Sequence, residues 1–207
     1  GDPEAAGFVA SLARPGANIT GVMNRAELRT KIFNIIREIL PAARRVAVLE
    51  HESDPIAARF SKSIQAAADA LRFDLRVVPV ARAEDLDRAF SDAVKGKAEA
   101  MFAPQAPFLL LHSGRIGELA LKSRLPLFST WRNFTAGGGL LSYHSELRES
   151  FARCAVLVDK ILRGASPAEL PVEQPDVFRL VVNMKTAKAL GITIPQSVLI
   201  RADEVIE

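Results

Sequence analysis

The sequence predicts an α/β fold in three layers, with helices on both sides of a mainly parallel sheet. Short β-branched runs alternate with amphipathic stretches from about residue 44 onward, and polar loops separate them. Within the amphipathic stretches, apolar residues recur every three or four positions, which indicates helices. Strands that alternate with helices form right-handed βαβ units, and these units build parallel sheets.

The expected elements follow one another in a regular order. A helix over 26–40 ends at Pro41, and the first strand, over 45–50, is short and β-branched like a buried parallel strand. The further strands are expected over 75–80, 100–103, 125–129, 139–143 and 178–182. The further helices are expected over 56–71, 83–94, 108–123, 146–163 and 185–190. Gly164 suits the end of the long helix, and the segments 192–195 and 199–206 are expected to be extended.

Composition argues against several classes of function. The 207 residues are 49% hydrophobic and 25% charged, which is ordinary for a globular protein. Lys and Arg number 27 against 24 Asp and Glu, but the charges are interspersed. A nucleic-acid-binding surface needs a basic stripe with aromatic residues for stacking, and the chain has one Trp and one Tyr. We therefore expect no nucleic-acid partner.

The sequence also lacks the motifs of metal, nucleotide and catalytic sites. The single cysteine, Cys154, excludes an internal disulfide, and its place between Phe151 and Val158 at helical spacing predicts a core residue. The three histidines lack metal-ligand spacing, and no Gly-rich nucleotide loop or nucleophile elbow occurs. No apolar run approaches the ~20 residues of a membrane span. We expect no metal, no cofactor and no catalytic residue.

Short phrases along the whole chain match one protein family in their order and spacing. They are Gly-Asp-Pro at 1–3, Leu-Ala-Arg-Pro-Gly-Ala-Asn-Ile-Thr-Gly at 12–21, Arg-Val-Ala-Val-Leu at 45–49, Ala-Gly-Gly at 136–138, Ser-Tyr at 142–143, Val-Asp-Lys-Ile-Leu-Arg-Gly-Ala at 158–165, Leu-Pro-Val-Glu-Gln-Pro at 170–175, Lys-Thr-Ala-Lys-Ala-Leu-Gly at 185–191 and Arg-Ala-Asp-Glu-Val-Ile-Glu at 201–207. With these phrases the chain resembles the substrate-binding proteins of bacterial ABC importers, of the group associated with tryptophan and tyrosine uptake.

The resemblance implies a type I periplasmic-binding-protein-like fold, in which three chain crossings join two α/β lobes around a ligand cleft. It implies a complete second lobe and a partial first lobe, hence an N-terminally truncated chain. Residues 1–25 would be a remnant of the first lobe and 26–143 the second lobe. Residues 144–175 would return to the first lobe, and 176–207 would close the hinge and the second lobe. A second lobe without most of the first should expose apolar surface, so we also expect possible self-association.

The function implied by the resemblance is solute binding for an ABC importer. A small organic solute, either an amino acid or an aromatic or carboxylate compound, would bind between the lobes and close the hinge, and a membrane permease would accept the closed form. The location would be periplasmic, or lipid-anchored outside the inner membrane. The alternative is a ligand-sensing domain of the same fold in a signalling or regulatory protein, which a fused helix-turn-helix or kinase domain would reveal. An enzyme on a doubly wound sheet is a third reading.

Candidate ligand residues follow from the rule that ligands bind at the carboxyl ends of parallel strands, together with the resemblance. They are Asp2, Pro3, His51, Gln105, Thr130, Trp131, Arg132 and Tyr143. Trp131 offers a stacking face, and Arg132 offers a fork for a carboxylate. Gln105 could bond an amide or a carboxylate.

Each candidate has a structural alternative. Trp131 could pack under a loop with Arg132 on the surface, Tyr143 could pack at the hinge, and Gln105 could be an ordinary turn residue. His51 could be a solvated loop residue. The family's loop there more often reads Asn-Pro-x-Asn-Pro, whereas this chain has Glu-His-Glu-Ser-Asp-Pro at 50–55. Asp2 could face a solute's ammonium group or cap a helix that starts at Glu4.

Overall fold

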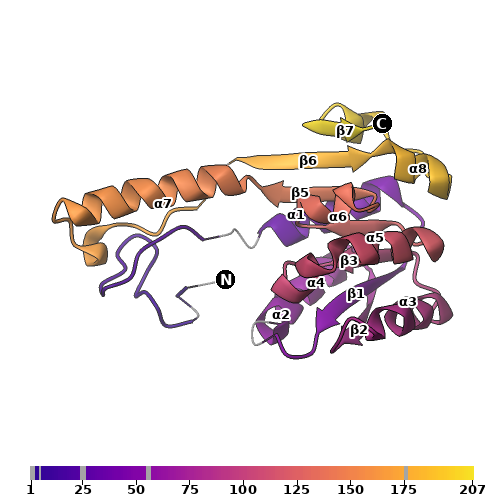
Figure 1. Cartoon of the computed structure of the whole chain (residues 1–207), viewed down its shortest axis with the longest axis horizontal. Coiled ribbons are helices and arrows are strands. Elements are labelled where there is room, and N and C mark those ends of the chain that lie inside the picture. Colours follow the sequence, from indigo (N-terminus) through magenta and orange to yellow (C-terminus); the bar gives the residue numbers. More distant parts are fainter. Residues whose placement is uncertain (1–2, 5, 24–26, 55–56, 175–176) are drawn as a thin grey trace. The chain divides into compact units, whose positions relative to one another are not determined.

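The structure is a computed structural model that describes residues 3–4, 6–23, 27–54, 57–174 and 177–207. The chain divides into two compact units (Figure 1). Unit 1 comprises Gly1–Ala26 and Ser145–Phe178, and unit 2 comprises Glu27–His144 and Arg179–Glu207. The chain therefore passes from one unit to the other at three points along the sequence. The lobe boundaries inferred from the family resemblance remain predictions.

Among the described residues, a seven-stranded sheet has the order β2-β1-β3-β4-β5-β6-β7. The strands are β1 (Arg45–His51), β2 (Asp74–Val80), β3 (Ala100–Ala103), β4 (Leu127–Ser129), β5 (Leu141–Ser145), β6 (Phe178–Asn183) and β7 (Glu204–Ile206). The pairs from β2 through β5, and the pair β6–β7, are parallel. The backbone N–H of Asn183, at the end of β6, donates to the carbonyl oxygen of Leu140 at 2.9 Å, just before β5 begins. Strands β5 and β6 thus run antiparallel, and the sheet is mainly parallel, as the sequence predicts.

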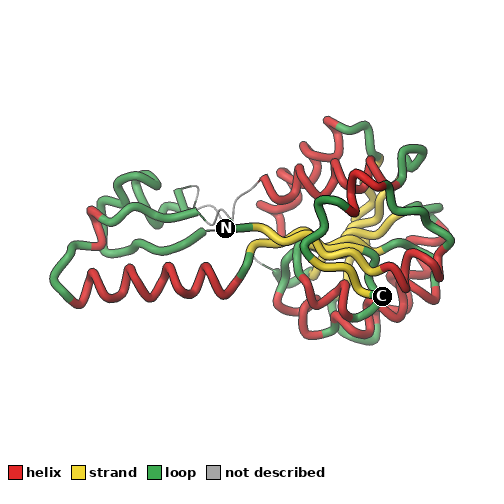
Figure 2. The backbone as a smooth tube through the Cα atoms, turned by 90° about the horizontal axis from the view of Figure 1, so that it is seen from above, coloured by secondary structure: helices red, strands yellow, loops and turns green. Residues whose placement is uncertain are grey.

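Helices cover both faces of this sheet, which makes the three layers (Figure 2). One face carries α1 (Glu27–Ile39), α2 (Ala57–Ala70), α8 (Met184–Leu190) and α9 (Gln196–Leu199). The other carries α3 (Asp85–Lys95), α4 (Pro107–Leu111), α5 (Ser113–Lys122) and α6 (Arg132–Ala136). Side chains alternate along β1, so Val46 and Val48 pack into the first core, and Ala47 and Leu49 into the second. Burial on both faces explains why β1 reads as a continuous apolar run.

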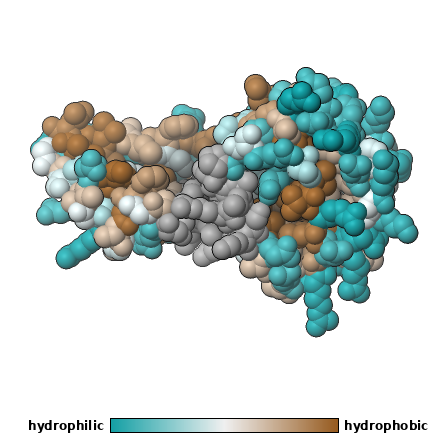
Figure 3. All heavy atoms as spheres, turned by 90° about the horizontal axis from the view of Figure 1, so that it is seen from below, coloured by the Kyte–Doolittle hydropathy of each residue, from teal (hydrophilic) through white to brown (hydrophobic). Residues whose placement is uncertain are grey.

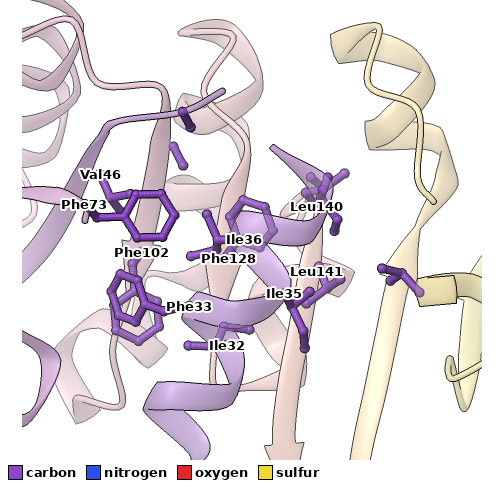
Figure 4. Packing of buried hydrophobic residues seen from close by; sticks show 14 of the residues in the cluster. Ile32, Phe33, Ile35, Ile36, Val46, Phe73, Phe102, Phe128, Leu140 and Leu141 are labelled. Atoms are coloured by element: carbon purple, nitrogen blue, oxygen red, sulfur yellow. The ribbon is translucent and has the colours of Figure 1, made fainter. Parts of the chain in front are cut away.

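The core under α1 is built around an aromatic cluster (Figure 4). The Phe33 ring centroid lies 6.0 Å from that of Phe73 and 5.4 Å from that of Phe102. Phe33 and its neighbours Ile32 and Ile36 are fully buried. Each such side chain contributes about 1.5–3 kcal/mol through removal of apolar surface from water. This burial holds α1 against the sheet.

Several local expectations differ from the structure. The helix expected over 108–123 breaks at His112, where φ is −104° and ψ is 16°, so it forms α4 and α5. The short helices α6 and α9 were not expected, because four or five residues are too few to show helical periodicity. The prediction that 199–206 is extended is wrong in part, since α9 includes Leu199.

Unit 1 contains α7 (Leu147–Leu162) and the short 3-10 helix η1 (Pro167–Glu169). Its N-terminal segment pairs with the segment after η1, where Val22 forms an isolated parallel bridge with Glu173. The Val172 N–H donates to the Leu12 carbonyl at 2.8 Å. The helix considered from Glu4 is absent from residues 6–13, which form turns and bends. There the Glu4 carboxylate accepts the Leu12 N–H at 2.6 Å.

The prediction that Cys154 is a core residue is wrong. Its thiol is only half-buried. The helical neighbours that suggested a core, Phe151 and Val158, are 71% and 54% exposed. Among the described residues, no helix is long and apolar enough to cross a membrane.

Candidate functional site

The strand order of unit 2 reverses at one point, between β1 and β3. From β1 the chain passes through α2 on one face to β2, then through α3 on the other face to β3, on the opposite side of β1. The two connections diverge, so the carboxyl ends of β1 and β3 border a crevice, where open α/β sheets bind ligands.

A pocket occupies this crevice. Its cavity volume is about 50 Å³, and the pocket opens to solvent at its mouth. Its walls include apolar side chains from β1, α2 and β2, and polar side chains from the loops that follow β1 and β3. The lining includes Val48, Ile64, Leu75, His51, Asp54 and Gln105. An apolar lining with a few polar groups at the mouth is typical of sites for small organic molecules. The pocket unites two of the predicted residues, His51 and Gln105.

His51 ends β1 and is held by an aromatic stack. Its ring lies parallel to that of Phe108 in α4, with 4.2 Å between centroids and 10° between planes. Phe108 in turn contacts His112 edge-on, with centroids 4.7 Å apart. The stack fixes the orientation of the His51 ring beside the pocket.

The end of β4 positions the predicted residue Trp131. The buried Ser129 hydroxyl donates to the Ala103 carbonyl at 2.8 Å and accepts the Trp131 backbone N–H at 3.2 Å. One hydroxyl thus ties the loop after β4 to the end of β3. The Trp131 ring packs against the core under α4 and α5. Its indole Nε1 is buried and has no hydrogen-bond partner among the described residues.

Arg132 begins α6, and its guanidinium is engaged within unit 2. Its Nε and Nη2 donate to the Glu204 carboxylate at 3.0 and 2.5 Å. This fork-to-fork pair is the geometry in which Arg recognises a carboxylate. The hydrogen bond from Arg132, aided by the positive charges of Arg132 and His144, lowers the pKa of Glu204. The carboxylate that Arg132 holds in this structure therefore comes from β7.

The remaining predicted residues are placed separately. Thr130 is buried in the turn between β4 and α6, and Tyr143 is a half-buried residue of β5. The Lys31 ammonium lies 5.8 Å from the Tyr143 ring centroid. Pro3 belongs to unit 1, where its carbonyl accepts the Phe8 N–H at 2.9 Å. Asp2 lies outside the described residues.

A match to one protein family covers nearly the whole length of the sequence. Residues 1–206 match the family described as ABC transporter substrate binding protein. The chain belongs to this family. The pocket beside β1 and β3 lies at the topological position where open α/β sheets bind ligands.

Individual relatives agree with the family. The tyrosine-binding protein of Clostridioides difficile is 21% identical over 189 residues, which are 91% of this chain and 54% of that protein. The chain thus spans about half the length of this curated relative. A crystal structure of a conserved domain protein from Vibrio cholerae has a TM-score of 0.90 and 24% identity, over 99% of this chain and 68% of that one.

A second solved structure is an ABC domain from Streptococcus pneumoniae in complex with L-Trp. Its TM-score is 0.88 at 24% identity, over 99% of this chain and 70% of that one. At this level of identity both structures support the fold. This substrate-binding family member therefore has the periplasmic-binding-protein-like architecture that the sequence resemblance implies.

Two residues that shape the site escaped the sequence prediction. Phe108 supports His51, and Glu204 holds Arg132. The sequence offered one signal for Phe108, which is its position directly after the Pro-Gln-Ala-Pro loop. Among the described residues, no group of three His, Cys, Asp or Glu side chains could hold a metal ion.

Proposed function

We propose that this chain is the solute-binding component of a bacterial ABC importer, and that it binds a small organic solute without a chemical step. One observation carries the proposal: in a chain that matches this family over residues 1–206, a pocket lies at the strand-order reversal of the sheet. Open α/β sheets bind ligands at this point of the topology.

The solute class we propose is an amino acid with an aromatic side chain. The apolar wall from Val48, Ile64 and Leu75 suits a ring, and the imidazole of His51 offers a planar face beside it. Gln105 supplies an amide that donates and accepts hydrogen bonds. The names of two relatives, one tyrosine-binding and one in complex with L-Trp, favour the same class.

The other predicted residues extend the proposal beyond this pocket. Trp131 brings a buried indole N–H without a partner in the described chain, and a solute oxygen would satisfy it. Thr130, Arg132, Tyr143, Pro3 and Asp2 are proposed as further contacts from the loops at strand ends. In this proposal a solute carboxylate competes with Glu204 for Arg132.

Titration calorimetry with L-Trp, L-Tyr and the other common amino acids tests the proposal. We expect binding of at least one aromatic amino acid. Gln105→Ala should lower the affinity about two- to tenfold, because a hydrogen bond to the solute contributes about 0.5–1.5 kcal/mol. Gln196→Ala removes an exposed amide from α9 and is the matched control, which should bind like the wild type.

Two results would contradict the proposal. The first is that no amino acid or aromatic acid binds to the protein or raises its melting temperature. The second is that a solute binds, but Gln105→Ala binds it as the wild type does. In that case the solute occupies another site.

The partner and the location complete the proposal. A membrane permease would accept the solute-loaded form, and the protein would act in the periplasm or be lipid-anchored outside the inner membrane. Hinge closure predicts a smaller radius of gyration in solution scattering when solute is added. An unchanged radius at saturating solute would argue against closure and leave the binding result standing.

A further inference from the structure

Strand β2 is an open edge of the sheet in unit 2. Figure 1 shows β2 at one border of the sheet and β7 at the other. Among the described residues, no strand pairs with β2 on the side away from β1. The edge belongs to unit 2, the lobe that the family resemblance implies to be complete. An open edge presents unpaired backbone N–H and C=O groups, to which a strand of another molecule can bond.

Hydrogen bonds identify which residues of β2 turn their backbone groups toward β1. The Asp74 N–H donates to the Arg44 carbonyl at 2.7 Å, and the Val80 carbonyl accepts the Glu52 N–H at 3.1 Å. Backbone groups point to alternate sides along a strand, so the even-numbered residues of β2 face β1 and the odd-numbered ones face outward. The odd-numbered residues are Leu75, Val77 and Pro79.

Pro79 occupies one of these outward positions. Proline has no N–H, so a strand tolerates it where the missing donor breaks no bond of the ladder. The Pro79 side chain is exposed, and its ring fills the place that a partner strand would approach. The pairing with β1 therefore stays intact, while the open edge loses a hydrogen-bond donor.

The rest of β2 would suit pairing with another strand. The stretch 75–80 reads Leu-Arg-Val-Val-Pro-Val, which is rich in β-branched residues and holds one charge. Segments of this kind pair readily when they lack proline. A second copy, turned about a two-fold axis at Val77, would set Leu75 of one chain opposite Pro79 of the other. At that point the missing N–H prevents a complete antiparallel ladder.

The opposite edge of the sheet is protected by other means. Strand β7 has three residues and begins with the charged Glu204, and both shortness and charge make an edge a poor template. The face of unit 2 that Figure 3 shows is largely hydrophilic. The seven residues of β2 are thus the longer edge of the sheet, and Pro79 is the feature that interrupts it.

We propose that Pro79 keeps the edge of β2 unpaired, and that a second copy of this chain is the molecule that it excludes. The proposal concerns the far side of β2 from β1 and does not depend on the proposed solute binding.

Sedimentation velocity of the wild type and of Pro79→Val, each over a range of concentrations, tests the proposal. We expect Pro79→Val to associate at concentrations about tenfold or more below those that the wild type needs, because each copy regains a hydrogen bond in the pair. Pro41→Val is the matched control, since Pro41 is exposed in the turn after α1 and outside any strand. It should sediment like the wild type. Circular dichroism checks that the variants fold.

Hydrogen exchange locates the contact without relying on the mass alone. In the wild type, the outward N–H groups of Leu75 and Val77 should exchange like unprotected amides. In associated Pro79→Val both should exchange about tenfold more slowly or less. Adding Val77→Pro to Pro79→Val returns a proline to an outward position and should restore the wild-type sedimentation.

A pair of proline variants tests the alternation along β2. The side chains of Arg76 and Val77 are both exposed, but only Arg76 turns its N–H toward β1. Arg76→Pro should therefore lower the urea midpoint of unfolding more than Val77→Pro does. Equal midpoints would show that the outward assignment of the edge is wrong.

Three further results would overturn the proposal. One is that Pro79→Val sediments like the wild type at every concentration. Another is that Pro79→Val associates while the Leu75 and Val77 amides still exchange freely, because the contact then lies elsewhere. The third is slow exchange of these two amides in the dilute wild type, which would mean that the edge is already bonded.

Discussion

The Gly137 carbonyl oxygen lies 2.0 Å from the position that a Cβ atom on Gly117 would occupy. Helix α5 and the end of α6 thus meet backbone to backbone. Gly137 and Gly139 also lie against neighbouring backbone. These glycines allow close packing beside the loop that carries Trp131.

Gly117→Ala should therefore destabilise the protein by about 3 kcal/mol or more, because the backbone oxygen opposite cannot move as a side chain can. Gly114→Ala in the same helix is the matched control, since its Cβ would meet nothing within 4 Å. That substitution should stabilise by about 0.5–1 kcal/mol through helix propensity. Urea unfolding of both variants measures the difference, and equal effects would contradict the close approach.

The loop after β4 should depend more on Ser129 than on the indole N–H of Trp131. Ser129→Ala removes one buried and one partly buried hydrogen bond and should cost about 1–3 kcal/mol. Trp131→Phe removes a buried N–H that has no partner in the described chain, so it loses no hydrogen bond. Thermal unfolding should show a clear loss for Ser129→Ala and a smaller one for Trp131→Phe. The reverse order would mean that the indole nitrogen is bonded in solution.

Phe108 should matter for solute binding although it does not line the pocket. Phe108→Ala removes the ring that orients His51, and aromatic pairs contribute about 0.5–1.5 kcal/mol beyond burial. Affinity for the solute should fall by up to about tenfold. Leu111→Ala is the control in the same helix, because that side chain is 80% exposed. If calorimetry finds equal affinity for both variants, the stack of Phe108 on His51 does not contribute to solute binding.

Acid should weaken the fold partly through Glu204. The Arg132 hydrogen bond lowers the pKa of Glu204 below its ordinary 4.5. A carboxylate with a lowered folded-state pKa contributes stability that is present above about pH 4.5 and lost as the pH falls through the lowered value. The contribution is no more than about 1 kcal/mol, since both side chains are partly exposed.

Glu204→Gln should reduce the free energy of unfolding by this amount at pH 7, and wild type and variant should converge at low pH. Denaturant titrations over the acid range measure it. If the free energies of unfolding of wild type and variant depend on pH in parallel, the Arg132–Glu204 pair adds nothing to stability. Asp203, whose pKa is lowered chiefly by the Leu180 N–H and also by Arg179, contributes with the same sign and persists in the variant.

Hydrophobic periodicity predicted most elements of unit 2, because they are long enough for apolar residues to recur at the spacing of a helix or a strand. Strand β3 has the predicted bounds, and α1 begins and ends within one residue of its prediction. The strand-end rule selected His51 and Gln105 as candidates, and the structure places both in the lining of one pocket, since parallel strands bring their carboxyl ends to one edge. Helix α6 was not predicted, because five residues are too few to show helical periodicity. Unit 1 was predicted less well, because turns with side-chain contacts such as Glu4 to Leu12 replace regular elements.

Taken alone, the sequence determines the α/β class, the order of strands and helices, and the family, because these follow from local patterns and from phrases in order. The tertiary structure decides which side chains contact one another. Glu204 holds Arg132 from 72 residues away, and Phe108 in α4 stacks on His51 in β1. Such contacts join positions far apart in the chain, and only the path of the folded backbone brings them together.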